Sequence, residues 1–109
     1  MTGRAIARVT GARPERREKI LIVVGNVTHA MDLALAFETA GFVVNSCGTV
    51  GAGCEAVSEH RFDLVVMEHE LPDGYGALLL RLVRAVPGTA KLPIIALCRE
   101  DQLKGGAGG

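Results

Sequence analysis

The sequence FDLVVMEHELPDGYG, residues 62–76, is the stretch that decides the fold of this chain. Its residues 64–67 form a short, continuously apolar and partly β-branched run, which is typical of a strand buried on both faces of a parallel sheet. The acidic residue Glu68 closes this run, and a loop containing Pro and Gly follows it. Ligands of open α/β sheets bind beyond the carboxyl ends of the strands, so we expect any chemistry of this domain around Glu68.

Strand and helix patterns alternate on both sides of this stretch. Further strands are predicted over residues 19–24, 42–45 and 92–97, from their apolar and β-branched runs. Helices are predicted from Thr28 to residue 40, from Thr49 to about residue 60, and over residues 77–86, and both threonines are expected to cap their helix through the hydroxyl group. The alternation predicts an α/β fold: a doubly wound parallel sheet of about four strands and three helices, with right-handed crossovers.

The length and the charge distribution indicate a single domain with two flanking segments. A chain of 109 residues has room for one core. Residues 1–19 carry a net charge of +4 and the remainder −4. We therefore expect a flexible basic leader over residues 1–18, the α/β domain over 19–98 and a Gly-rich tail over 99–109. No aromatic residue is interleaved with the arginines of the leader, so no nucleic-acid partner is expected.

The cysteines and the apolar runs bear on the cellular compartment. Cys47, Cys54 and Cys98 are odd in number and form no Cys-x-x-Cys pair, so we expect reduced, buried thiols and no metal site. No apolar run approaches the roughly 18 residues that a membrane span requires. The N-terminus also lacks the apolar core of a signal peptide. The sequence therefore predicts a cytoplasmic protein without a membrane contact.

The order, length and sequence of these elements, from residue 19 to residue 97, resemble the receiver domains of response regulators. The matching segments are ILIVV at 20–24, FVV at 42–44, DLVVMEHELPD at 63–73 with Gly76, and LPIIAL at 92–97. The resemblance implies a flavodoxin-like receiver fold, here truncated at its C-terminal end. It also implies a bacterial protein of two-component or phosphorelay signalling.

The resemblance implies a phosphate-acceptor site as well, but this chain departs from the family at most of its positions. The family's third strand ends in the aspartate that accepts phosphate from a histidine kinase, and this chain has Glu68 there. The acidic pair that holds Mg²⁺ corresponds to Gly25 and Asn26, and the Thr or Ser that senses the phosphoryl group corresponds to Cys98. The lysine of the family's fifth strand has no counterpart. Because phosphoryl transfer depends on positioning and on charge neutralisation, much of it by the metal, we expect no phosphotransfer, no enzymatic activity, and no metal or other cofactor.

These departures predict a pseudo-receiver that works by binding another protein. In the family, the first helix and the adjacent loops dock on the helical phosphotransfer bundle of a histidine kinase. A kinase or such a bundle is therefore the expected partner. The corresponding contact residues in this chain are His29, Ala30 and Met31 at the start of the first helix, with Pro72 and Tyr75 from the central loop.

Two alternative functions stay open at this point. The first is a conventional response regulator that is phosphorylated on Glu68 or Asp73. The second is a small-molecule or nucleotide-binding module that uses the loop from Gly48 to Gly53, since a Gly-rich turn between a strand and a helix can cradle phosphate.

The fourth predicted strand, residues 92–97, leads to an expectation about assembly. Without a fifth strand beside it, this strand would be the edge of the sheet, with unpaired N–H and C=O groups next to apolar surface. Large uncovered apolar patches are rare on stable monomers. We therefore expect self-association through this edge, or an obligate partner.

Overall fold

The computed structural model describes residues 17–98 of the chain. The expected tail at 99–109 lies outside the described residues, as does all of the expected leader except residues 17 and 18. In chain order the elements are β1 (Lys19–Val23), α2 (Val27–Thr39), β2 (Val43–Cys47), α3 (Val50–Glu59), β3 (Leu64–Glu68), β4 (Glu70–Leu71), β5 (Gly74–Tyr75), α4 (Gly76–Ala85), the 3₁₀ helix η1 (Pro87–Thr89) and β6 (Ile94–Leu97).

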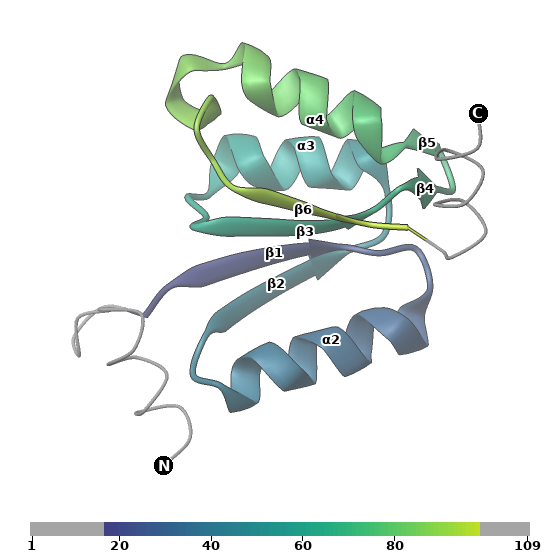
Figure 1. The fold of residues 1–109 in the computed structure, drawn as a ribbon, viewed down its shortest axis with the longest axis vertical. Coiled ribbons are helices and arrows are strands. Elements are labelled where there is room, and N and C mark those ends of the chain that lie inside the picture. The colour runs from purple at the N-terminus through teal and green to yellow at the C-terminus, as the bar shows by residue number, and fades with distance from the viewer. Residues whose placement is uncertain (1–16, 99–109) are drawn as a thin grey trace.

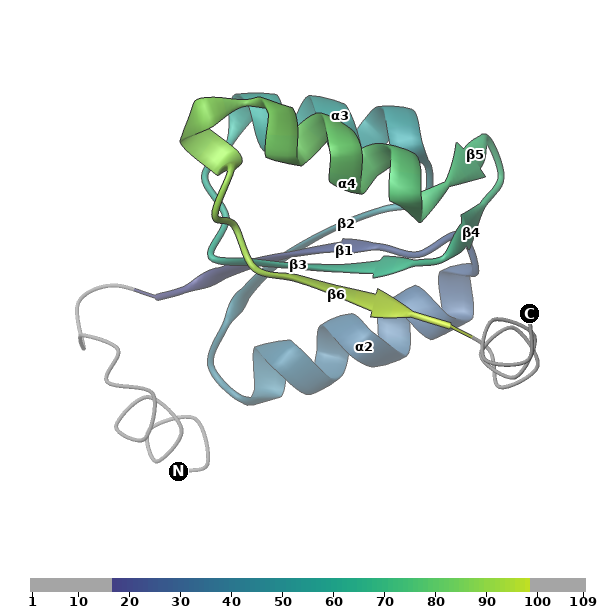
Figure 2. The ribbon, with the colours of Figure 1, turned by 45° about the horizontal axis from the view of Figure 1, so that its top comes forward.

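The main sheet contains four parallel strands in the order β2-β1-β3-β6, and helices cover both of its faces. Helix α2 lies on one face, while α3 and α4 lie side by side on the other (Figures 1 and 2). The predicted doubly wound α/β fold is therefore confirmed. Among the helices of residues 17–98, none is long and apolar enough to cross a membrane.

Two apolar clusters hold the helices to the sheet, because successive residues of a strand point to opposite faces. On the side of α3 and α4, the strand residues Leu21, Val65 and Met67 pack with Leu79 and other buried side chains. The second cluster, on the side of α2, consists of Ile20, Ile22, Val24, Ala30 and Val66. Both clusters are built around β1 and β3, which explains why these strands are the most continuously apolar segments of the sequence.

The helix caps agree with the sequence prediction in one case and differ in the other. Thr49 caps α3, since its hydroxyl oxygen accepts the N–H of Ala52 at 3.0 Å. Helix α2 begins earlier than predicted, and Asn26 caps it instead of Thr28: the Oδ1 atom of Asn26 accepts the N–H of His29 at 2.8 Å. Both residue types are good caps, and the sequence alone did not distinguish between them.

The cysteines are free thiols, as expected, but they are not all buried. Cys47 and Cys54 are half-buried beside the cluster under α3, and desolvation by burial raises the pKa of both thiols. Cys98 is exposed just beyond β6. The prediction of a buried thiol at Cys98 is wrong because this residue follows the end of β6, which pairs with β3 alone among the described strands, and it lines an open cleft.

Strand β6 is an edge strand within residues 17–98, since it pairs with β3 alone. The N–H of Val65 bonds to the carbonyl of Pro93, and the N–H of His69 bonds to that of Leu97. Alternate residues of a parallel strand bond to the same neighbour, so the backbone groups of Ile94 and Ala96 point to the outer edge. The loop that leads into β6 is fixed by Arg84, which donates to the carbonyl of Leu92 at 2.6 Å.

Candidate functional site

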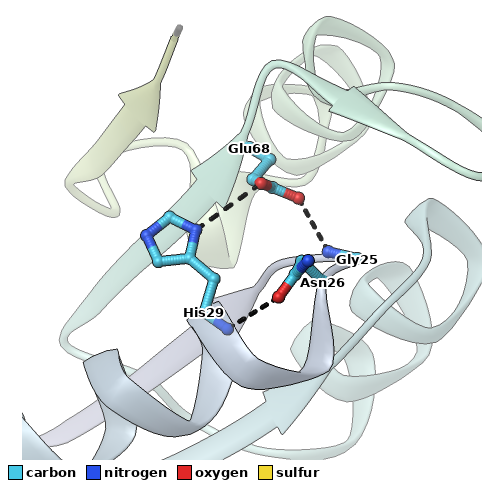
Figure 3. A network of polar contacts seen from close by, with 4 residues as sticks. All are labelled: Gly25, Asn26, His29 and Glu68. Carbon is cyan, nitrogen blue, oxygen red and sulfur yellow. Dashed lines mark hydrogen bonds and ion pairs between the residues drawn. The ribbon is translucent and has the colours of Figure 1, made fainter.

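The carboxylate of Glu68 reaches from the end of β3 to the loop between β1 and α2. Its Oε1 atom accepts the backbone N–H of Gly25 at 2.8 Å, and its Oε2 atom lies 3.7 Å from Nδ1 of His29 (Figure 3). The side chain of Glu68 is only 25 % exposed. This carboxylate is therefore tied to the chain's own backbone, 43 residues away in sequence.

Gly25 stands where the receiver pattern has an acidic residue, and its surroundings leave little room for a side chain. A Cβ atom at this position would lie 3.0 Å from Cδ of Pro72 and 3.6 Å from Oε1 of Glu68. The first distance is so short that the ring of Pro72 would have to shift. The absence of an acid at residue 25 and the position of Pro72 are therefore parts of one packing arrangement.

The residues around Glu68 do not fit a Mg²⁺ site. Magnesium prefers an octahedral set of oxygen ligands that includes one or more carboxylates. Here Gly25 offers no side chain and Asn26 offers a neutral amide that already caps α2. Within residues 17–98, no group of three or more His, Cys, Asp or Glu side chains could hold a metal ion.

Four of the nine expected site residues line one open cleft of about 550 Å³ at the carboxyl ends of the strands. Asn26, His29, Glu68 and Cys98 line it, together with Thr28, Asp32, His69, Glu70 and Leu97. Neither lysine nor arginine lines this cleft in the described part of the chain. Its described lining is therefore acidic, and His29 and His69 are the only groups in that lining that can gain a positive charge.

The five expected contact residues do not all lie at the surface. Met31 and Tyr75 are strongly exposed, and His29 and Pro72 are exposed too. Ala30 is only 7 % exposed because it packs against the sheet in the cluster under α2. The expectation that Ala30 contacts a partner is therefore corrected.

Asp73 has a structural role that the sequence analysis did not identify. Its Oδ1 atom accepts the N–H of Val50 at 2.7 Å, and its Oδ2 atom accepts the N–H of Gly51 at 3.0 Å. These two backbone hydrogen bonds lower the pKa of the Asp73 carboxyl group. The sequence does contain a signal for this cap. Asp73 is an acidic residue in the loop after β3, and that loop meets the start of α3 at the same edge of the sheet.

The start of α3 has no amide left for a phosphate group. Asp73 takes the N–H groups of Val50 and Gly51, and Thr49 takes those of Ala52 and Gly53 through its hydroxyl and carbonyl oxygens. Phosphate binding at a helix N-terminus requires free N–H groups. The structure therefore does not support the nucleotide-binding alternative at the loop from Gly48 to Gly53.

Comparison with known proteins agrees with this fold. The sequence pattern of the response regulator receiver domain matches residues 20–106, and the chain belongs to this family. The transcriptional activator protein PfeR of Pseudomonas aeruginosa is 32 % identical over 88 residues, which cover 80 % of this chain and 29 % of PfeR. The chain thus spans less than a third of the length of this relative.

Solved structures show the same fold. A sensor protein from Polaromonas sp. JS666 has a TM-score of 0.75 and 25 % identity, with 82 % of this chain and 71 % of that one covered. For the chemotaxis response regulator CheY4 of Vibrio cholerae the TM-score is 0.76 and the identity 20 %, with 86 % and 82 % covered. The receiver domain of a sensor histidine kinase from P. aeruginosa, with magnesium coordinated in its active site cleft, has a TM-score of 0.77 and 23 % identity, with 86 % and 76 % covered.

These comparisons confirm the receiver resemblance and its signalling context. The chain is a receiver domain of two-component signalling. Receiver domains are in general signalling modules without enzymatic activity of their own, and they interact with protein partners such as kinases.

Proposed function

We propose that this chain is a pseudo-receiver that acts in bacterial two-component or phosphorelay signalling by binding another protein, without transferring phosphate. The observation that carries the proposal is the hydrogen bond from the N–H of Gly25 to Oε1 of Glu68. It commits the acceptor carboxylate to the backbone at the place where a receiver would hold its metal. A cytoplasmic location is part of the same proposal.

The electrostatics of the cleft argue against phosphorylation of Glu68. A phosphoryl group brings negative charge that must be neutralised by metal or by basic side chains. The cleft offers Asp32 and Glu70 beside Glu68, and no Lys or Arg within the described residues. The described carboxylates would therefore repel added negative charge, and within residues 17–98 the cleft has His29 and His69 to offset it.

Phosphorylation of Asp73 is disfavoured for a different reason. Both of its oxygens accept backbone N–H groups at the start of α3. Phosphorylation of one oxygen, which forms an acyl phosphate, would remove at least one of these hydrogen bonds and uncap the helix. Neither Glu68 nor Asp73 is therefore favoured as the phosphate acceptor that the alternative of a conventional response regulator requires.

The proposed binding surface is formed by the start of α2 and the loop before α4. It consists of His29, Met31, Pro72 and Tyr75, and it leaves out the buried Ala30. The ring of Tyr75 lies against His69, with 5.7 Å between the ring centroids, so a large aromatic group is held at the surface. Exposed apolar and aromatic side chains such as Met31 and Tyr75 suit a partner made of helices, such as the phosphotransfer bundle of a histidine kinase.

A binding assay tests this surface. A panel of purified histidine-kinase phosphotransfer domains is titrated against the wild-type chain, Met31→Glu and the control Leu82→Glu, which makes the same change on α4. We expect at least one domain to bind, Met31→Glu to weaken the binding tenfold or more, equivalent to about 1.4 kcal/mol, and Leu82→Glu not to weaken it. Equal binding by wild type and Met31→Glu, or no binding to any domain, would contradict the proposal.

Self-association through β6 is a further part of the proposal. Ile95 is half exposed, and the backbone groups of Ile94 and Ala96 point to an edge that no described strand covers. Such an edge is a template for another strand. Ala96→Pro removes one outward N–H without touching the bonds to β3, so we expect it to lower the association measured by sedimentation.

A further inference from the structure

Helix α2 carries an exposed apolar stripe that the sheet does not use. Three residues spaced four apart lie on one side of the helix, all at least 65 % exposed: Val27, Met31 and Leu35. The face that packs on the sheet is a different one, since it contains Ala30, Leu33, Ala34 and Phe37. The helix is therefore apolar on two sides, and the second side has no contact that accounts for it within the described residues.

Helix α4 carries a second stripe with the same residue spacing. Leu78 and Leu82 lie on the helix, and Val86 is its C-cap in extended backbone; the three are again spaced four apart, with exposed fractions of 46–52 %. Leu79 and Val83 make the buried face of this helix. The α2 stripe therefore extends over about two helical turns and the α4 stripe over one turn and the cap residue, and both present branched or flexible apolar side chains to the outside.

The charges beside the two stripes are opposite in sign. Helix α2 contains Asp32 and Glu38 and no Lys or Arg, whereas α4 contains Arg81 and Arg84 and no Asp or Glu. Glu38 lies three residues after Leu35, and Arg81 lies three residues after Leu78. Residues three apart are neighbours on a helix surface. The α2 stripe therefore has a negative charge beside it, and the α4 stripe has a positive charge beside it.

We propose that the α2 stripe of one copy packs against the α4 stripe of a second copy. A second copy fits because it supplies both an apolar stripe of matching residue spacing and the complementary charge. The two helices lie on opposite faces of the sheet (Figures 1 and 2), so one copy cannot bring its own stripes together.

The contact is therefore heterologous: different surfaces meet, and one stripe of each kind stays open at the ends of an assembly. Heterologous contacts form rings or open chains instead of closed two-fold dimers. The inference is independent of the edge pairing of β6 and of the kinase partner. It adds a regulatory consequence, because Met31 belongs to both surfaces and a second copy would cover it.

Complementation between two variants tests the contact. Met31→Glu damages only the α2 stripe and Leu82→Glu only the α4 stripe, and both residues are exposed, so circular dichroism should show native folding. Both are made in the Ala96→Pro background to weaken edge pairing. By sedimentation velocity, the Ala96→Pro chain alone should associate with rising concentration, each double variant should remain a monomer, and their equimolar mixture should form a one-to-one heterodimer through the two intact stripes.

Charge variants supply a second readout. Arg81→Glu and Glu38→Arg should each raise the dissociation constant at least tenfold, and the chain that carries both should recover most of the affinity. The proposal is overturned if Met31→Glu and Leu82→Glu associate as the parent chain does, or if their mixture stays monomeric. Association of the wild-type chain that Ala96→Pro alone abolishes would support edge pairing and overturn the helix contact. A wild-type chain that is monomeric at hundreds of micromolar would overturn both.

Discussion

Glu68 and Asp73 are acidic side chains five residues apart in one segment, and each reaches a backbone N–H at the start of a helical unit. Asp73 accepts two N–H groups of α3, and Glu68 accepts the N–H of Gly25 just before α2. The contacts of Asp73 are structural, since they fix the loop after β3 to the start of α3. Glu68 occupies the position where the resemblance to receivers implies the phosphate acceptor, and its hydrogen bond with Gly25 makes it a second structural contact.

Under the proposed function, this chain keeps the receiver fold while its site has lost the phosphate chemistry. One added methylene lets the carboxylate of Glu68 span to the β1–α2 loop, where Gly25 leaves its N–H accessible beneath Pro72. The hydrogen bonds that fix the loops around Glu68 and Asp73 are present, whereas Gly25 and Asn26 supply no carboxylate that would bind a metal. The predictions below separate these two sets of interactions.

The largest effect is expected at Gly76, the first residue of α4, which packs against the backbone of Glu68. A Cβ atom at this position would overlap the carbonyl oxygen of Glu68, so Gly76→Ala must displace the end of β3 or the start of α4. We expect a loss of about 3 kcal/mol in the free energy of unfolding, as for severe overpacking. The control Gly88→Ala meets no atom within 4 Å and should change stability by less than about 1 kcal/mol. Equal effects of the two substitutions in urea titrations would contradict this account.

A smaller, pH-dependent effect is expected from Asp73→Ala. Its folded-state pKa is lowered by the hydrogen bonds to Gly51 and Val50, so the carboxylate stabilises the fold above its unfolded pKa of about 3.9. That contribution is lost as the pH falls through the lower folded-state pKa. The gap in melting temperature between wild type and variant should be constant from pH 7 to about pH 5 and should close below about pH 4. A gap that persists unchanged in acid would show that the carboxylate is not the cap.

The smallest effects are expected at Glu68, and their order is informative. Glu68→Ala should lose about 1 kcal/mol with the hydrogen bond from Gly25. Glu68→Asp should behave like it, since the side chain is one methylene too short. Glu68→Gln keeps an acceptor and should lose less than about 0.5 kcal/mol, the contribution of a partly exposed charge opposite His29. If thermal unfolding shows that Glu68→Gln is as destabilising as Glu68→Ala, then the charge of Glu68, and not its hydrogen bond, stabilises this region.

The sequence predicted the four strands and three helices of the fold because their signals are local. The apolar, partly β-branched run of residues 64–67, followed by a loop with Pro and Gly, is typical of a buried strand, and Thr49 is a residue type that commonly caps a helix. The short pair β4 and β5 was not predicted, because two-residue strands have no periodicity to detect. The burial of Ala30 could have been found, since Leu33, Ala34 and Phe37 follow it at helical spacing on one face.

The candidate site was predicted in its position but not in its contacts. That Glu68, Asn26, His29 and Cys98 share a cleft follows from strand order and the resemblance to receivers. The hydrogen bond between Glu68 and Gly25 joins residues 43 apart, and its existence depends on the distance between two loops, which no sequence pattern encodes. The same holds for Asp73, which reaches α3 across 22 and 23 residues.

The most direct test of the central claim, that Glu68 is a structural contact and not a phosphate acceptor, is intact mass spectrometry after incubation with acetyl phosphate and Mg²⁺. A receiver domain that has the acceptor aspartate serves as the positive control under the same conditions. We predict that the control gains a phosphoryl group while this chain keeps its unmodified mass. A phosphoryl adduct on this chain that peptide mapping assigns to Glu68 or Asp73 would contradict the account.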